Sequence, residues 1–492
     1  MRSTFDPLAL TSPFALRTSH FLAAATLILV AAFGSAPSAQ RPGTLTAAPQ
    51  IGRVYDAIFD ARFEQVPALL TQACPPAPPE VCTLLDVVNL WWQIQIDPEN
   101  RSRDAAFLVR ADAAIAAVEA WTKREPERAE SWFYLGGAYG ARAQLRVLRG
   151  ETLSAARDGK RIKEALERAL MLDPVLQDAY FGIGLYHYYA GVAPTAARIL
   201  RFLLALPGGD QVAGMQEMLR ARDGGQVLRD EADYQLHLID LWYEKQPQRA
   251  LTLLRGLRER HPRNPHFWEL IARVEDRYLH DRHASIGSWR ALLQAAEGNR
   301  VAMREMAEAT ARLALAPALD AGYETDLALD SVRRVIAAHP ASPFGAVLQA
   351  QQLERRYQER LNAPTDTARA YRLSLAGWRA FERGALPDAA RLLNQAVALR
   401  PKEMVARYRL ARVLAAQNDD DAAVEMFESV LLSFQSTPPA FYAYACVDAA
   451  RLYEQRGETP RAIELYRRAL PIYGADPETK DAAQRALARL GA

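Results

Sequence analysis

Apolar residues recur at helical spacing along most of this chain, and glycine or proline residues stand between the periodic segments. Apolar positions that return every three to four residues are typical of amphipathic α-helices. The first three predicted helices cover residues 51–72, 80–96 and 103–123. The many Ala, Leu, Arg and Glu residues favour helix, whereas the runs of Thr, Ile and Val that favour strands are scarce. The pattern therefore predicts an all-α protein.

Small and apolar positions repeat with a fixed period in the later part of the chain. Ala250 and Ala284 are 34 residues apart, and so are Ala389 and Ala423. Ala462 follows Ala423 after 39 residues. Other positions keep the same phase within two of the units: Tyr234, Leu238, Leu241, Leu254, Leu257 and Pro262 in one, and Gly377, Gly384, Ala396 and Pro401 in the other. A period of about 20 to 50 residues indicates a stack of small helical units.

One unit carries a sequence motif. Its residues are Trp132, Leu135, Gly136 and Tyr139, in the spacing W-x2-L-G-x2-Y. This motif resembles the first helix of the tetratricopeptide repeat, a helix–turn–helix unit of about 34 residues. The resemblance extends over residues 126–476 and implies a right-handed α-solenoid of helix pairs. The second helix of this unit matches at Ala165, Ala169, Leu172 and Pro174. These positions come about 14 residues late, so we expect one or both helices to be lengthened.

The resemblance divides the chain into four parts. We expect a signal peptide over 1–38, an atypical helical cap over 39–125, repeats with insertions over 126–340, and C-terminal repeats with a capping helix over 341–492. In the second unit we assign Tyr180, Gly184 and Tyr188 to the first helix and Gly191, Ala196, Leu200 and Leu203 to the second. Gly-Gly pairs at 208 and 224 bracket a short helix over 212–221, which we interpret as an insertion.

The N-terminus has the parts of a secretory signal peptide. Arg2, Arg17 and His20 precede an uncharged segment over 21–33, and small residues follow it. The segment has 13 residues, whereas a membrane span needs about 20. We expect cleavage after Ser38 or Ala39 and a periplasmic or secreted protein. The alternative is an uncleaved segment that anchors the chain in a membrane.

The cysteines fit an oxidising compartment. Cys74 and Cys82 bracket the proline-rich stretch 75–79, which we expect to join two helices. The pair would close this loop as a disulfide, although two separately buried thiols are equally compatible with the sequence. Cys446 is left over at a helix-core position, where we expect a small buried side chain.

Charge and motifs give little sign of catalysis or of nucleic-acid binding. The chain has 60 basic and 58 acidic residues, so no strong field favours nucleic acid or anionic lipid. His280 and His283 would share a helix face as two metal ligands, but no third ligand is near and we expect a polar turn. No zinc-protease, phosphate-loop or serine-hydrolase motif occurs. We therefore expect no enzyme activity, no cofactor, no metal and no small-molecule substrate.

The aromatic residues give the main functional signal. The resemblance implies that certain positions of each first helix line a concave groove. On that mapping one group of candidate partner-binding residues is Phe181, Tyr188, Tyr189, Trp242 and Tyr243, and the other is Tyr371, Trp378, Phe381, Tyr408 and Tyr444. Aromatic side chains supply large, rigid contact area at peptide-binding surfaces. The alternative is ordinary packing between helices, because a phase error of one residue would turn these side chains inward.

Two functions remain compatible with the sequence. The first is an exported, non-enzymatic scaffold that holds a protein or peptide in a concave helical groove. The second is the helical superstructure of a peptidoglycan-acting envelope enzyme, similar to the helical part of lytic transglycosylases, or an accessory subunit of such an enzyme. Helical repeats extend nearly to Ala492 and leave no room for a separate catalytic domain, which favours the scaffold.

Overall fold

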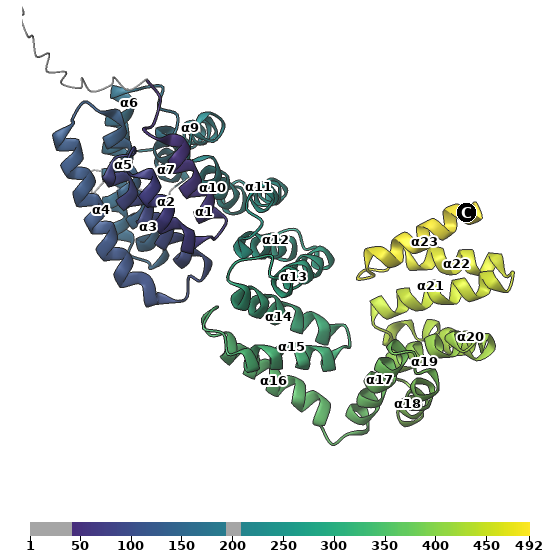
Figure 1. Cartoon of the computed structure of the whole chain (residues 1–492). Coiled ribbons are helices and arrows are strands. Elements are labelled where there is room, and N and C mark those ends of the chain that lie inside the picture. Colours follow the sequence, from purple (N-terminus) through teal and green to yellow (C-terminus); the bar gives the residue numbers. More distant parts are fainter. Residues whose placement is uncertain (1–41, 193–207) are drawn as a thin grey trace, which may run out of the picture. The chain divides into compact units, whose positions relative to one another are not determined.

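A computed structural model describes residues 42–192 and 208–492 of the chain (Figure 1). Within these two ranges every regular element is a helix, which confirms the predicted fold class. None of the helices described is long and apolar enough to cross a membrane. The predicted signal peptide, its cleavage site, and Ala196, Leu200 and Leu203 all lie outside the described residues.

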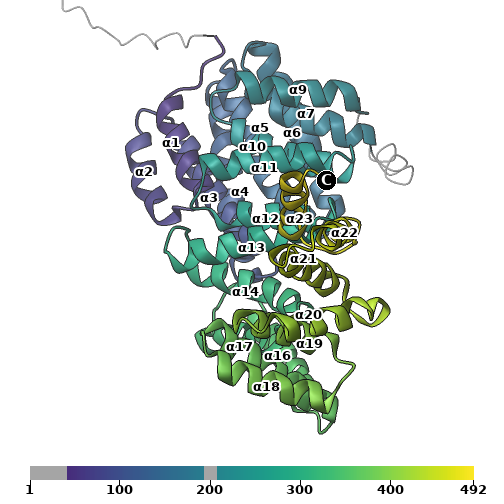
Figure 2. The same cartoon turned by 90° about the vertical axis from the view of Figure 1, so that its right-hand side faces the viewer.

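The helices pack mainly against their neighbours in the chain (Figure 1; Figure 2). The first four are α1 (Ala48–Phe59), α2 (Val66–Ala73), α3 (Pro79–Ile96) and α4 (Asp104–Arg124). The next are α5 (Ala129–Leu148), α6 (Thr152–Leu172), α7 (Ala179–Val192), α9 (Gln211–Gly224), α10 (Arg229–Trp242), α11 (Pro247–Arg260), α12 (Pro265–Arg277) and α13 (Arg282–Glu297). They are followed by α14 (Arg304–Ala321), α15 (Thr325–Ala338) and α16 (Ala346–Asn362). The last are α17 (Asp366–Glu382), α18 (Leu386–Leu399), α19 (Met404–Ala416), α20 (Asp420–Leu431), α21 (Pro439–Gln455), α22 (Thr459–Ala469) and α23 (Pro477–Leu490).

The periodic small residues lie where paired helices touch. Ala389, Ala396 and Ala423 are fully buried, as their phase predicts. At the motif glycine, Gly136, an added Cβ would lie 2.7 Å from the side chain of Leu166 on α6, so α5 and α6 approach each other closely. Both helices are long, with 20 and 21 residues, against 14 each in α10 and α11. The expected lengthening therefore affects both members of this pair.

One predicted helix is divided in two, and a second has closer packing than expected. The segment 51–72 forms two helices, because the chain turns between Phe59 and Val66 and Ala61 adopts a left-handed conformation with a φ of 54°. The short helix predicted as an insertion over 212–221 is α9, which packs directly against α7. A Cβ on Gly184 would lie 2.8 Å from the carbonyl oxygen of Gly214, so the two backbones meet at glycines. The sequence analysis interpreted the flanking Gly-Gly pairs as boundaries and missed this packing.

The N-terminal helices are bound to several later units. The backbone N–H of Arg263 donates to Asp60 (3.0 Å), and the Asn264 amide donates to the Phe59 carbonyl oxygen (2.7 Å). At the end of α3, the Asp97 carboxylate accepts from the hydroxyl of Ser342 and from the N–H of Phe344. These bonds reach from α1 and α3 to the connections before α12 and α16. The helices α1 and α3 therefore do more than form the terminal cap that the sequence suggested.

Aromatic packing continues the same contact in the interior. Trp92 on α3 is fully buried, and its ring centroid lies 4.4 Å from that of Phe59 on α1. The ring centroids of Tyr234 on α10 and Phe267 on α12 lie 4.9 Å and 6.0 Å from that of Trp92. One hydrophobic cluster accordingly runs from the N-terminal helices to α12.

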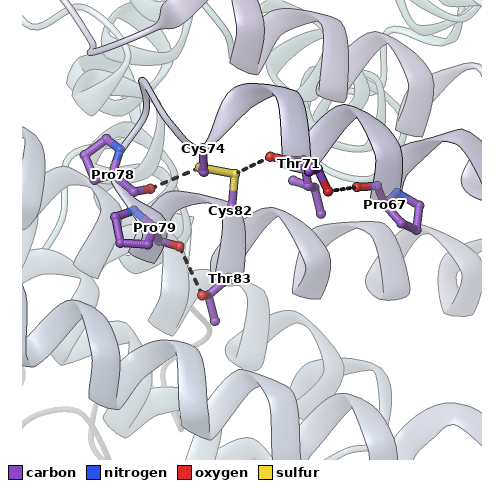
Figure 3. The surroundings of a disulfide bond; sticks show 8 residues. Pro67, Thr71, Cys74, Pro78, Pro79, Cys82 and Thr83 are labelled. Carbon is purple, nitrogen blue, oxygen red and sulfur yellow. Dashed lines mark hydrogen bonds between the residues drawn. A yellow bond between two sulfur atoms is a disulfide. The ribbon is translucent and has the colours of Figure 1, made fainter.

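The structure joins Cys74 and Cys82 in a disulfide, with an S–S distance of 2.08 Å (Figure 3). Cys74 follows the last residue of α2 and Cys82 lies in the first turn of α3, so the bond closes the proline-rich loop. Cys446 is a free thiol that is completely buried. Burial raises the pKa of this thiol to about 12, which suits a packing role.

Two buried histidines flank Tyr234. His237 is fully buried against the Tyr234 carbonyl oxygen, and His266 Nε2 lies 3.2 Å from the Tyr234 hydroxyl. Burial lowers the pKa of both imidazoles to about 3. Burial also raises the pKa of nearby Glu231 to about 7. The folded protein thus holds both histidines neutral at pH values where the unfolded chain protonates them.

The pH dependence of stability should reflect these shifts. Between about pH 6.5 and 4.5 the unfolded chain binds two histidine protons that the folded chain lacks, while Glu231 is protonated only in the folded chain. Acid therefore destabilises the fold through the histidines, and Glu231 offsets part of this. We expect His266→Gln to reduce the loss of unfolding free energy by about 1.4 kcal/mol per pH unit in that range. Urea titrations at several pH values measure this slope.

A matched control distinguishes the effect of a buried histidine on the pH dependence of stability from the effect of an exposed one. His280 lies in an exposed turn, with a φ of 55°, rather than on a helix face shared with His283. His280→Gln should leave the slope as it is in the unsubstituted protein. Equal slopes for all three proteins would mean that His266 is not held neutral by burial.

Candidate functional site

The structure divides the predicted partner-binding residues into buried and accessible ones. Buried members are Phe181, Tyr188, Tyr371 and Tyr408. Half-buried members are Tyr189, Trp378, Phe381 and Tyr444, while Trp242 and Tyr243 are exposed. The four buried residues offer no free face to a partner. For these four, the alternative interpretation of packing between helices is the correct one.

The structure brings three residues of the first predicted group together: the rings of Tyr188, Tyr189 and Tyr243 have centroids 5.6 to 5.9 Å apart. Phe181 packs in the N-terminal core, and the Tyr188 hydroxyl donates to Glu244 (2.5 Å) from a fully buried ring. Trp242 and Tyr243 stand at the end of α10, where 52% and 42% of their surfaces are exposed. The Trp242 indole N–H donates to the hydroxyl of Tyr278 (3.1 Å), an exposed residue that the sequence analysis did not single out.

The second group contains a compact surface made by successive first helices. We name it the Trp378 surface and define it as Trp378 and Phe381 on α17, Arg412 on α19 and Tyr444 on α21. Trp378 and Phe381 are three residues apart, so they lie on the same side of α17. Their rings stack with centroids 5.0 Å apart and an interplanar angle of 28°. Both rings remain partly accessible to solvent.

Arg412 covers both rings of this stack. Its guanidinium carbon lies 5.9 Å from the Trp378 centroid and 5.8 Å from the Phe381 centroid, within the range of cation–π attraction. The guanidinium also donates to the Tyr408 hydroxyl (3.2 Å) and lies 3.4 Å from an Asp448 carboxylate oxygen. These contacts hold a half-buried cation in a defined position beside the aromatic stack.

Tyr408 supports this arrangement from below the surface. Its hydroxyl donates to Asp448 (2.9 Å), and its ring packs against Phe427 and Phe441. We expected Tyr408 in the groove because of its position in the repeat. The correction has a physical reason: Phe427 and Phe441 come from α20 and α21 and cover the ring on both sides.

Arg409 lies under the same stack and is fully buried. It donates to the Ser374 hydroxyl (3.0 Å) and to the Tyr323 carbonyl oxygen (2.7 Å), and its guanidinium carbon lies 5.7 Å from the Trp378 centroid. Burial lowers the pKa of Arg409 to about 10. The group is inaccessible to a partner and serves to fix α19 against α17 and the turn before α15.

An ionic contact fixes the other side of α17. Arg379 donates to Asp326 (2.7 Å) and pairs with Glu324, both near the start of α15. Tyr371, the remaining member of the predicted group, is buried with its hydroxyl 2.8 Å from that of Thr325. The helix that carries Trp378 and Phe381 is therefore held rigidly by polar contacts along its length.

Two aromatic residues near the surface were missed by the sequence analysis. Phe441 is half-buried, and its ring lies 5.6 Å from that of Tyr444 and 5.5 Å from that of Tyr323. Phe441 and Tyr444 have the three-residue spacing that also joins Trp378 and Phe381, and that spacing could have identified it. Tyr323 lies in a turn, with a φ of 61°, so its position could not be predicted from spacing along a helix.

Ionisable side chains elsewhere in the described residues offer few signs of chemistry. None of the His, Cys, Asp and Glu side chains in the described ranges form a group of three suited to a metal ion. A cavity of about 330 Å³ lies between α1 and the α10–α11 pair and contains Asp56, Asp60 and Asp230. Arg260 and His261 both contact Asp230 at 2.7 Å. Because Arg260 and His261 already bond to the Asp230 carboxylate, we interpret the cavity as part of the packing between helices.

Comparisons with known proteins agree with the helix-pair architecture. Two family models, each described as tetratricopeptide repeat, match residues 380–445 and 445–479. A search of curated proteins gives no match.

Three solved structures are similar at low identity. The TPR domain of P58(IPK) is 14% identical, over 83% of this chain and 98% of that one, with a TM-score of 0.28. The TPR2AB domain of yeast Sti1 in complex with pHSP90 is 14% identical, over 53% and 96%, with a TM-score of 0.22. A chain of the APC/C hetero-tetramer Cut9–Hcn1 is 13% identical, over 90% and 97%, with a TM-score of 0.23. At these TM-scores the likeness adds no argument of its own.

The likeness to tetratricopeptide repeats covers the C-terminal helix pairs. The matched segment, 380–479, includes the pairs α19–α20 and α21–α22 and all of α18. The same pairing and the same buried alanines continue towards the N-terminus. Residues 380–479 are therefore similar to tetratricopeptide repeats, and the helix pairs before them have the same kind of packing.

Proposed function

We propose that this protein is an exported, non-enzymatic scaffold that binds a protein or peptide partner through the Trp378 surface. The main support for this proposal is the stacked, partly accessible pair Trp378 and Phe381, over which Arg412 is held. Tetratricopeptide repeats act as protein-interaction scaffolds, which is the coarse function that the family supports.

The chemistry of the Trp378 surface suits partner binding. Aromatic and arginine side chains dominate the residues that contribute most to binding energy at protein interfaces. Here the two rings stack on each other and the guanidinium is oriented by Asp448 and Tyr408 before any partner arrives. A preorganised surface loses less conformational entropy on binding.

The N-terminal half also exposes aromatic rings, at Trp242 and Tyr243, but no described arginine or lysine lies over them as Arg412 lies over Trp378 and Phe381. Tyr234 and Phe267, on α10 and α12, are covered by Trp92 of α3. Phe181 and Tyr188 are buried in the core as well. The cation held over the aromatic stack therefore supports placing the partner on α17, α19 and α21 rather than on α7 and α10.

Export is supported by two features of the sequence. The N-terminal residues have the order of a signal peptide, and Cys74 and Cys82 are placed to form a disulfide, a bond that persists in oxidising compartments. Within the described residues we find no observation that favours the envelope-enzyme alternative.

Site-specific photo-crosslinking tests the proposed surface. A photoreactive phenylalanine analogue at Phe381 should trap a discrete protein or peptide in the native envelope. Phe344, at the start of α16, is an exposed phenylalanine away from the Trp378 surface and gives a matched control. The proposal predicts a crosslink at Phe381 and none to the same partner at Phe344. The same product from both positions, or none from Phe381, would contradict it.

A further inference from the structure

A charged cleft of about 590 Å³ lies between α5 and α6. It is lined by Tyr139, Arg142 and Arg146 from α5 and by Ser154, Arg157, Asp158, Lys160, Arg161 and Glu164 from α6. Five of these side chains are basic and two are acidic. The lining is thus more basic than the chain, in which the two signs nearly balance, and Asp112 and Glu151 pair with Arg142 and Arg146 from outside it.

The cleft occupies the lengthened part of the α5–α6 pair. Between Thr152 and Glu164, Asp158 is the one buried residue of α6. Apolar packing resumes closer to the rest of the fold, at Ala165, Leu166 and Ala169. The added length of this helix pair is therefore held together by charged side chains, which a purely structural extension would not require.

The floor of the cleft consists of two guanidinium groups around one carboxylate. Arg142 donates to both Asp158 oxygens, at 2.6 and 3.2 Å, and Arg146 donates to one of them at 2.6 Å. Arg142 also reaches Asp112 on α4 (2.6 Å). These bonds fix the positions of both guanidinium groups at the base of the cleft.

The rim of the cleft carries the excess positive charge. Arg157, Lys160 and Arg161 are exposed on α6, and Lys160 and Arg161 follow Arg157 by three and four residues. Glu164 is 3.9 Å from Lys160 and 3.6 Å from Arg161, and no described residue forms an ion pair with Arg157. Like charges at this spacing disfavour a helix unless a counter-charge lies among them.

We propose that this cleft binds a compact, multivalent phosphate-type anion, with Arg157, Lys160 and Arg161 as direct contacts and Arg142 and Arg146 beneath them. Guanidinium groups pair with phosphate oxygens in a two-point geometry. The volume of the cleft falls within the range of about 300–1,000 Å³ that is common for small-molecule sites. More than one anionic group is needed to satisfy three rim cations, so the ligand is an oligophosphate or a molecule that carries one. This site is separate from the Trp378 surface.

Isothermal titration of the full chain with inorganic tripolyphosphate tests the proposal. The double variant Arg157→Gln, Arg161→Gln removes two exposed contacts that hold no buried group in place. The matched variant Arg355→Gln, Arg356→Gln removes the same charge from two exposed positions on α16. At physiological salt we expect saturable one-site binding that is at least about tenfold weaker in the first variant and unchanged in the second.

Other outcomes would overturn the proposal. Absence of saturable binding, equal affinity in the first variant, or an equal loss in the α16 variant would each show that the cleft is not the binding site. A parallel sedimentation assay with phosphatidylglycerol-containing vesicles distinguishes a membrane from a soluble anion. Vesicle binding that needs Arg157 and Arg161, without tripolyphosphate binding, would replace the proposed ligand by a lipid surface.

Discussion

Replacing Trp92 by alanine is expected to lower the free energy of unfolding by about 3–5 kcal/mol, as large-to-small changes at buried aromatic positions do. The Trp92 ring is fully buried and packs on Phe59, Tyr234 and Phe267. These partners belong to α1, α10 and α12, so the substitution opens a void between the N-terminal helices and two repeat units. Thermal melts, together with hydrogen exchange on α1–α3 and α10–α13, measure the effect and its extent.

An exposed tryptophan provides the control for this substitution. Trp242 is 52% exposed at the end of α10, and Trp242→Ala should change stability by only about 0.5 kcal/mol. The account also expects Trp92→Ala to lower exchange protection in α10 and α12 as well as in α3. Loss of protection in α1–α3 alone would mean that these helices form an independent cap and do not stabilise the repeats.

The repeats could be predicted from the sequence because their signal is local and periodic. Ala389, Ala396 and Ala423 recur in phase, and each is buried where two helices touch. Gly136 lies where its motif requires two helices to approach closely, and it faces Leu166 of the neighbouring helix. The helix-pair fold follows from such positions without knowledge of distant contacts.

The packing of the N-terminal helices could not be predicted in the same way. Asp60 bonds to Arg263 and Asp97 to Phe344, across separations of 203 and 247 residues. No spacing rule joins residues so far apart, and each contact uses a backbone N–H that the sequence does not distinguish. The boundary between α1 and α2 was missed because Ala61, at a positive φ, gives no sign of a turn.

Only part of the candidate site could be predicted, because the sequence again does not show contacts between distant helices. Repeat phase indicates the side of a helix on which a residue lies, and it placed Trp378 and Phe381 together. Repeat phase does not indicate which side chains of other helices pack against a residue. Tyr408 was therefore expected at the surface, although Phe427 and Phe441 pack against its ring. Cross-helix burial of this kind needs the three-dimensional arrangement.

Removing the aromatic pair of the Trp378 surface should have a large effect on binding. Truncation of an aromatic hot-spot residue costs about 2 kcal/mol or more, which is a loss of about 30-fold in affinity. We therefore expect Trp378→Ala, Phe381→Ala to weaken binding of the partner crosslinked at Phe381 by at least that factor. Both side chains are half-buried, so the fold should tolerate their loss better than that of fully buried Tyr408.

The most direct test of the proposed scaffold function is the dissociation constant of this partner for the unsubstituted protein and for the Trp378→Ala, Phe381→Ala variant, with melting temperatures measured on the same samples. Phe344→Ala serves as the matched control. The account predicts at least about 30-fold weaker binding in the double variant, unchanged binding in Phe344→Ala, and a folded protein in both cases. Unchanged affinity in a folded double variant would contradict the assignment of partner binding to the Trp378 surface.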